Sequence, residues 1–215
     1  MQLAEVYMHP WKTFVVLGDS FTEGIGDSVD GRGPVSTLDQ LATVLKRRVP
    51  DMRYINLARR GLLTREVRET QLEPALALKP DLVSIIAGAN DLLKRKWQPG
   101  RYEEDMWFMF RAFKNGGATL MSATHPDWTV RLPLPEPAKA KLQAQIVEAN
   151  TILRRLAKMF DAAVVETYRL ELDHDPTLWS RDGIHPNTLG YDAYAEAGRR
   201  TLEAHSGLAL ERQVE

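Results

Sequence analysis

The sequence predicts an α/β fold, a three-layer α/β/α sandwich in which a five-stranded parallel sheet lies between two layers of helices. Five short apolar runs recur along the 215 residues, and segments with helical periodicity separate them. Strands that alternate with helices form parallel βαβ units with right-handed crossovers. No linker, repeat or low-complexity tract divides the chain, so we expect one domain over residues 1–215, with its core at roughly 13–204.

The predicted strands are continuous apolar runs, often with β-branched residues, rather than runs that alternate with polar residues. Continuous runs are typical of strands that helices cover on both faces, as in a parallel sheet. The predicted strands cover residues 13–19, 52–58, 81–88, 118–124 and 162–168.

The predicted helices are the segments in which apolar residues recur at steps of three and four. The clearest such stripe runs from Leu142 to Phe160, and shorter ones start at Leu38 and at Tyr102. A last helix is expected to begin near Asn187 or Thr188, since either side chain can cap a helix N-terminus. Irregular segments are expected at 91–100, 125–137 and 169–187. All three follow strands and should therefore lie at the carboxyl edge of the sheet, where open α/β sheets bind ligands.

Composition excludes several classes of function. The formal net charge of −1 gives no reason to expect a nucleic acid or an anionic membrane as partner. The chain has no cysteine, and its histidines show no metal-ligand spacing, so we expect no disulfide, no thiolate nucleophile and no metal site. No secretory leader or membrane-spanning run is recognisable, so a cytoplasmic protein is expected. The oligomeric state stays open.

Polar motifs follow four of the predicted elements of the sheet. They are "GDSFTEG" (18–24) after the first strand, "NLARRG" (56–61) at the second, "GAND" (88–91) after the third and, through a longer connection, "WSRDGIHPN" (179–187) after the fifth. The carboxyl ends of parallel strands meet at one edge, so these segments should converge although they lie far apart in sequence.

The residue types in these motifs suit acyl transfer through a serine. A serine hydroxyl needs a base to take its proton, and a histidine needs an acceptor that fixes its tautomer. Ser20 can be the nucleophile, His185 the base and Asp182 the acceptor. The backbone N–H groups of Ser20 and Gly61 and the side-chain amide of Asn90 can donate to an oxyanion. Each residue taken alone is also a common turn or cap residue.

Together, "GDS" (18–20), "NLARRG" (56–61), "GAND" (88–91) and "DGIH" (182–185) resemble the four sequence blocks of the GDSL/SGNH hydrolase superfamily, in the family's order. The resemblance implies a flavodoxin-like fold, hydrolysis of esters or thioesters or transfer of acyl groups, and no cofactor. It implies that Ser20, His185 and Asp182 form a catalytic triad, and that Ser20, Gly61 and Asn90 form the oxyanion hole. Phe21 stands where the family has leucine.

The expected partner is a small-molecule carboxylic ester, whose acyl length and alcohol the sequence does not specify. Aromatic and polar residues near the expected site are candidates for contacting it, with anchoring of loops as the alternative for the tryptophans. These candidates are Asp19, Arg60, Trp97, Trp128 and Trp179. Cations also gather there, and either favour an anionic substrate or form a solvated face. They are Arg59, Arg60, Lys94, Arg95, Lys96 and Arg101.

Three alternatives stay open. The same site can serve an acyltransferase or a thioesterase. "GDSFTEG" can instead cradle a phosphate or flavin in a flavodoxin-like binding module, because hydroxyl groups and backbone amides suit phosphate oxygens. That interpretation gives no role to Asp182, His185 or Asn90. The fold can also serve protein contacts without catalysis, which the complete set of site residues argues against.

Overall fold

A computed structural model describes residues 11–168 and 171–210. Five parallel strands form one sheet in the order β2-β1-β3-β4-β5. Their bounds are β1 (Thr13–Gly18), β2 (Arg53–Asn56), β3 (Leu82–Ile86), β4 (Thr119–Ala123) and β5 (Ala162–Val165). Each lies within one of the ranges predicted from the sequence, so the five-stranded parallel sheet is confirmed.

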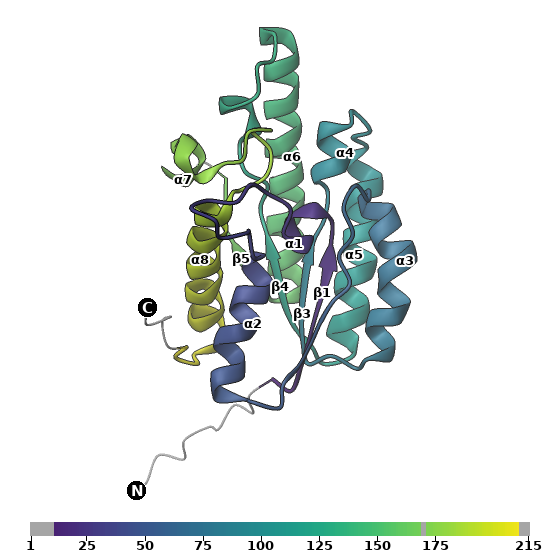
Figure 1. The fold of residues 1–215 in the computed structure, drawn as a ribbon. Helices are drawn as coiled ribbons and strands as arrows, with labels where there is room; N and C mark the ends of the chain where they lie inside the picture. The colour runs from purple at the N-terminus through teal and green to yellow at the C-terminus, as the bar shows by residue number, and fades with distance from the viewer. Residues whose placement is uncertain (1–10, 169–170, 211–215) are drawn as a thin grey trace, which may run out of the picture.

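Helices cover both faces of this sheet (Figure 1). Helices α2 (Thr37–Arg48) and α8 (Thr188–Ser206) cover one face. Helices α3 (Thr64–Ala77), α5 (Pro99–Asn115) and α6 (Glu136–Phe160) cover the other. The start of α8 agrees with the sequence, since the Asn187 side chain caps it by accepting a hydrogen bond from the Gly190 N–H. Among the described residues, no helix combines the length and apolar character that crossing a membrane requires.

Alternate residues of each strand supply two separate cores. Phe14 and Val16 of β1 face α2 and α8, whereas Val15 and Leu17 face α3, α5 and α6, and all four are 0% exposed. Successive side chains of a strand point to opposite faces of the sheet, so a sheet covered on both faces needs apolar residues at every position of the strand. This two-sided burial explains why the strand runs show no polar alternation.

Several short helices lie where the sequence predicts irregular chain. Within 91–100, helix α4 (Ala89–Leu93) includes the first three residues, and α5 already begins at Pro99. Helix α7 (Glu171–His174) and two single 3₁₀ turns, Trp128–Val130 and Pro176–Leu178, lie in the other two segments. Helices of three to five residues are too short to show an apolar period, so the sequence pattern cannot reveal them.

The strand order places a topological switch point between β1 and β3. The connection after β1 leads to one side of the sheet, towards β2, and the connection after β3 leads to the other, towards β4. Loops that diverge in this way leave a crevice at the carboxyl ends of the two strands. Helix α1 (Ser20–Glu23) follows β1 and helix α4 follows β3 (Figure 1). Ser20 opens α1 and Asn90 is the second residue of α4, so both belong to the segments that begin at this crevice.

The last residue of β1, Gly18, is held from two sides. Its N–H donates to Gln71 Oε1 and its carbonyl accepts from Gln71 Nε2, both at 2.9 Å. A Cβ at Gly18 would lie 2.4 Å from the Ile86 carbonyl oxygen and 2.4 Å from Thr22 Oγ1, so only glycine fits between β3 and α1. Ser20 lies two positions after Gly18, so the position of its side chain depends on how Gly18 is held.

We expect Gln71→Ala to lower the free energy of unfolding by about 1–3 kcal/mol, because it leaves the Gly18 N–H buried without a partner, while the Gly18 carbonyl keeps the hydrogen bond from the Arg59 N–H. Urea denaturation measures the change. Glu73→Ala, an exposed position on the same helix, is the matched control and should change stability by less than about 0.5 kcal/mol. Equal effects of the two substitutions would contradict the role given to Gln71.

Candidate active site

A chain of short contacts joins three side chains at the carboxyl edge of the sheet. His185 Nε2 lies 2.7 Å from Ser20 Oγ, and His185 Nδ1 lies 2.6 Å from Asp182 Oδ2. Ser20 is 9% exposed and opens α1, whereas Asp182 and His185 belong to the turn that precedes α8. Residues 165 positions apart therefore share one hydrogen-bonded chain.

The turn that carries Asp182 and His185 is held by its own backbone. Asp182 Oδ1 accepts hydrogen bonds from the N–H groups of Ile184 and His185, at 2.8 and 3.0 Å. The Ser180 N–H donates to the His185 carbonyl at 2.8 Å, and Trp179 forms an antiparallel bridge with Pro186. The His185 imidazole is therefore held by a closed loop in which the Asp182 carboxylate accepts hydrogen bonds both from the ring and from the backbone.

The Asp182 carboxylate is kept ionised by these bonds. Burial alone would raise its pKa, but the hydrogen bonds from the His185 ring and from two backbone N–H groups outweigh that effect and hold the pKa below its ordinary value. An ionised acceptor at Nδ1 fixes the neutral imidazole as the Nδ1–H tautomer, which leaves the Nε2 lone pair directed at Ser20 Oγ.

A second set of contacts fastens this turn to the loop after α1. The Asp27 N–H donates to Ser180 Oγ at 2.8 Å, and Asp27 Oδ2 accepts from the Arg181 N–H at 2.9 Å. Arg131 stacks on Trp179, with its guanidinium carbon 3.3 Å from the ring centroid, and donates from Nε to a backbone carbonyl of the turn. Sequence analysis missed the roles of Asp27, Ser180 and Arg131, because nothing local marks contacts between residues about 50 to 150 positions apart.

Three groups around Ser20 can donate to a developing negative charge. Within the described residues, the backbone N–H groups of Ser20 and Gly61 donate to no other atom. Gly61 has φ = +82°, a conformation that favours glycine, and its carbonyl accepts from Lys94 Nζ at 2.7 Å. Asn90 Nδ2 donates to the Leu62 carbonyl at 3.0 Å and to Asp19 Oδ2 at 3.3 Å. Both of its hydrogens are therefore engaged in this state.

Asp19, directly before Ser20, is 1% exposed. Burial raises its pKa to about 7, and the nearby Asp91 carboxylate adds to the rise, while hydrogen bonds from the Phe21 N–H and from Asn90 oppose it. The side chain accepts the Phe21 N–H at 3.2 Å and so caps α1. Asp19 thus lies beneath the site as a buried acid.

Trp128, one of the candidate substrate contacts, lies beneath the site as well. It is 0% exposed, and its Nε1 donates to the Ile184 carbonyl at 3.2 Å. Its ring packs edge-on against Phe21, and the Phe21 ring in turn lies 5.5 Å from the His185 ring, centroid to centroid. The aromatic residue at position 21 therefore contacts the imidazole from the side of the core.

The other candidate contacts differ in their surroundings. Trp179 is 7% exposed and its Nε1 donates to a backbone carbonyl, which favours the loop-anchoring interpretation. Trp97 is half-buried and donates from Nε1 to Glu148 at 2.8 Å. Arg60 is largely exposed and is bound through its guanidinium and its backbone N–H to Glu23. Trp97 lines a surface cleft.

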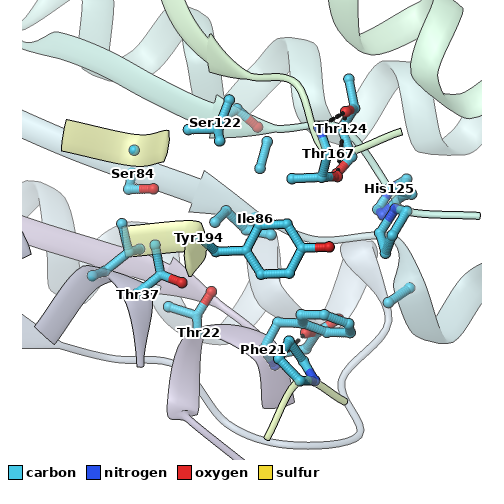
Figure 2. A pocket seen from close by; sticks show the side chains of 18 of the residues that line it. Phe21, Thr22, Thr37, Ser84, Ile86, Ser122, Thr124, His125, Thr167 and Tyr194 are labelled. Atoms are coloured by element: carbon cyan, nitrogen blue, oxygen red, sulfur yellow. Dashed lines mark hydrogen bonds between the residues drawn. The ribbon is translucent and has the colours of Figure 1, made fainter. Parts of the chain in front are cut away.

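A narrow cavity of about 60 Å³ lies behind α1, between the sheet and the layer formed by α2 and α8. Thr22 Oγ1, Ser84 Oγ and His125 Nε2 line it and are buried without a hydrogen-bond partner among the described residues. Figure 2 shows these three side chains around the ring of Tyr194. Burial lowers the pKa of His125 to about 4, so that its imidazole is neutral at pH 7. The cavity has room for about four water molecules.

Comparison with known proteins bears on this arrangement. A family model described as "GDSL-like Lipase/Acylhydrolase family" matches residues 16–193. The chain belongs to this family. Lipases and acylhydrolases cleave carboxylic esters, so the predicted enzyme class, carboxylic ester hydrolase, is confirmed at the level of the family. Within the described residues, no group of three or more His, Cys, Asp or Glu side chains is placed to hold a metal ion.

Relatives of this GDSL-like chain include an acetylxylan esterase from Xylanibacter ruminicola, 27% identical over 199 residues. That alignment covers 84% of this chain but 41% of the relative, so the chain spans less than half of that protein. A lipase/acylhydrolase from Enterococcus faecalis has a TM-score of 0.68 at 23% identity, covering 94% of this chain and 99% of that one. An alpha/beta hydrolase from the metagenome of Lake Arreo has a TM-score of 0.71 at 21% identity, covering 91% and 95%. These structures share the fold.

We expect the raised pKa of Asp19 to make stability fall as pH rises. Between the unfolded value near 3.8 and the folded value of about 7, the folded chain binds the proton more tightly, so unfolding becomes easier with increasing pH. Asp19→Asn removes this titration. The variant should gain about 2–4 kcal/mol relative to wild type between pH 4 and pH 8, from urea midpoints.

Asp51→Asn controls for the loss of one formal charge at an exposed position. A difference between Asp19→Asn and wild type that stays constant with pH would show that Asp19 is already ionised throughout this range.

Proposed function

We propose that the chain hydrolyses carboxylic esters through an acyl-enzyme on Ser20, with His185 as general base and Asp182 as its orienting carboxylate. The observation that carries this proposal is the unbroken chain of contacts from Asp182 Oδ2 through His185 to Ser20 Oγ, at 2.6 and 2.7 Å. A serine within proton-sharing distance of an oriented imidazole is the arrangement that serine hydrolases use to activate the hydroxyl.

In the proposed first step, Ser20 Oγ attacks the ester carbonyl while its proton passes to His185 Nε2. The Asp182 carboxylate, whose pKa lies below its ordinary value, stabilises the imidazolium that forms. His185 then gives the proton to the leaving alcohol. Water, deprotonated by the same nitrogen, attacks the acyl-enzyme and releases the acid, which restores Ser20.

The proposed oxyanion hole requires one exchange of partners. The N–H groups of Ser20 and Gly61 are free to donate within the described chain, but both hydrogens of Asn90 Nδ2 are engaged. The bond to Asp19 Oδ2 is the longer of the two, at 3.3 Å, and is the one we expect the oxyanion to replace. Protonation of Asp19, whose pKa is about 7, weakens its hold on the amide.

An apolar cleft next to these donors is the proposed site for the acyl group. It has a volume of about 440 Å³ and is lined by five leucines, Trp97, Pro137 and Ala138, with Arg95, Lys141 and Gln145 as its polar residues. Leu92 and Leu93 follow Asn90 on α4, and Leu132 contacts the turn that carries Asp182, since its Cδ2 lies 3.7 Å from where a Cβ at Gly183 would lie. A small or medium acyl ester, of a sugar or a lipid, suits this cleft; the acetylxylan esterase relative supports an acetylated sugar.

The contact between Ser20 and His185 favours catalysis over the phosphate- or flavin-binding alternative. A phosphate cradle needs the hydroxyl of Ser20 as a free donor, whereas here that oxygen lies 2.7 Å from an imidazole nitrogen. Acyl transfer and thioester cleavage use the same site. Product analysis with a second alcohol present distinguishes transfer from hydrolysis.

We expect Ser20→Ala to lower kcat by about 10⁶-fold, because the attacking oxygen is removed. A panel of p-nitrophenyl esters from acetyl to palmitoyl, with acetylated sugars and an acyl-CoA alongside, measures the loss and the substrate range. Ser28→Ala, an exposed serine in the following loop, is the control. Near-wild-type turnover by purified Ser20→Ala protein would overturn the assignment.

We expect Asn90→Ala to lower kcat by about 10²–10³-fold with a much smaller change in KM, because the amide acts on the oxyanion rather than on the bound ester. Steady-state kinetics on the best ester of the panel measures both constants. A rise in KM with unchanged kcat would instead place Asn90 in ground-state binding.

A further inference from the structure

We propose that the pocket on the outer side of α4 binds an anionic group, phosphate or carboxylate, carried by the alcohol portion of the ester. The inference rests on the function proposed above, because it assigns this pocket to one arm of the substrate. The pocket has a volume of about 390 Å³ and is lined by Leu63, Arg65, Asp91, Arg95, Lys96, Gln98 and Arg101.

Cations dominate this pocket. Arg95, Lys96 and Arg101 are exposed and form no ion pair within residues 11–168 and 171–210, while Arg65 pairs with Glu69 on its own helix. The pocket contains one carboxylate, Asp91, which is partly buried. Its Oδ2 accepts hydrogen bonds from the N–H and the hydroxyl of Thr64, both at 2.9 Å. Asp91 is thus occupied with holding α3 to α4.

Some exposed arginines of this chain have carboxylate partners. Arg154 pairs with Glu166 at 2.7 Å, and Arg155 pairs with Glu103 at 2.6 Å, whereas Arg48 and Arg53 form no ion pair among the described residues. The cations of this pocket differ from Arg48 and Arg53 because three of them without an ion pair line one pocket. Unpaired cations around one pocket repel one another, and the positive field they create attracts anions. The three cations of this pocket thus have the arrangement expected of a site whose counter-charge arrives with a ligand.

The N-terminal turn of α5 adds to the positive field. Gln98 caps this 17-residue helix without a side-chain hydrogen bond, and no acidic residue lies in the first turn. The first turn instead contains Arg101. Anions and acidic side chains are favoured at a helix N-terminus, and a cation there is unfavourable unless an anion joins it.

The pocket begins next to the groups that surround the ester carbonyl. Asp91 follows Asn90, and Leu63 follows Leu62, whose carbonyl accepts a hydrogen bond from Asn90 Nδ2. The apolar cleft proposed for the acyl group lies on the other side of α4, and Arg95 lines both. An ester whose carbonyl lies at Asn90 can therefore extend its acyl group into the cleft and its alcohol portion into the cationic pocket.

The backbone at Arg95 offers a sharp test. Arg95 ends α4 in the left-handed conformation, with φ = +57°, which glycine adopts without strain. Lys79 ends α3 in the same way, with φ = +49°, at the opposite edge of the sheet. Arg95→Gly and Lys79→Gly therefore each remove one exposed cation and one strained backbone position. They differ in the cation removed, arginine or lysine, and in their distance from the pocket.

The experiment compares kcat/KM for phenyl acetate, 4-acetoxybenzoate and 4-acetoxyphenyl phosphate, which share an acetyl group and differ in the charge of the alcohol. In Arg95→Gly, the ratio of an anionic ester to phenyl acetate should fall by about 5- to 30-fold, the loss of one charge-assisted contact. Lys79→Gly should leave this ratio unchanged. An unchanged ratio in Arg95→Gly, or an equal fall in Lys79→Gly, overturns the proposal.

The two anionic esters distinguish the two sources of the charge. A fall confined to the phosphate ester identifies phosphorylated alcohols as the class of substrate. A comparable fall for the carboxylate identifies acidic alcohols more generally.

Binding of phenyl phosphate, which has no carboxylic ester, tests the pocket independently of catalysis. Amide shifts of Arg95, Lys96 and Arg101 on titration of the wild-type protein, lost in Arg95→Gly, support the pocket even if Ser20→Ala should retain esterase activity. If Ser20→Ala is inactive but phenyl phosphate shifts none of these amides, the anion site alone is wrong.

Discussion

The position of the whole site depends on how β1 ends. Gly18 lies between the Ile86 carbonyl of β3 and Thr22 of α1, and the two amide contacts from Gln71 fix its peptide groups. A larger residue would separate β1 from β3, and loss of the Gln71 amide would leave the buried Gly18 N–H without a partner. Ser20 lies two residues after Gly18, so the position of its hydroxyl is fixed by the end of β1 in the sheet. The His185 imidazole then has to be positioned next to a hydroxyl group whose place is already fixed.

His185 is brought to that point by a loop that is closed on itself and fastened to its neighbour. Asp182 binds the ring and two backbone N–H groups, and Asp27 joins the same loop to the chain that leaves α1. Both halves of the serine–histidine contact thus connect to one local framework. A productive contact needs atoms held within a few tenths of an ångström, which single loops seldom achieve without such support.

Much of this could be predicted from the sequence, and the missing parts share one physical cause. The strands and the start of α8 at Asn187 are local patterns of apolar and capping residues, and they lie where they were expected. The approach of Ser20 and His185 follows from parallel strands ending at one edge. The burial of Asp19, the contact of Asp27 with Ser180 and the stacking of Arg131 on Trp179 depend on which side chains meet across the fold, and no spacing along the chain encodes that.

Charge is distributed unevenly around the crevice, and this sets limits on the substrate. Beneath it, Asp19 has a pKa of about 7 because burial disfavours its charge, so at pH 7 this carboxyl group is about half protonated rather than fully ionised. Beside it, Arg95, Lys96 and Arg101 line the pocket on the outer side of α4 and form no ion pair within the described chain. The cleft across α4 is more apolar, since five leucines and Trp97 line it together with Arg95 and Lys141. An ester whose acyl and alcohol portions are both uncharged would leave the cations of the pocket in contact with water and would occupy only the cleft. An ester with an apolar acyl group and an anionic alcohol uses both, so the asymmetry of the site favours an asymmetric substrate.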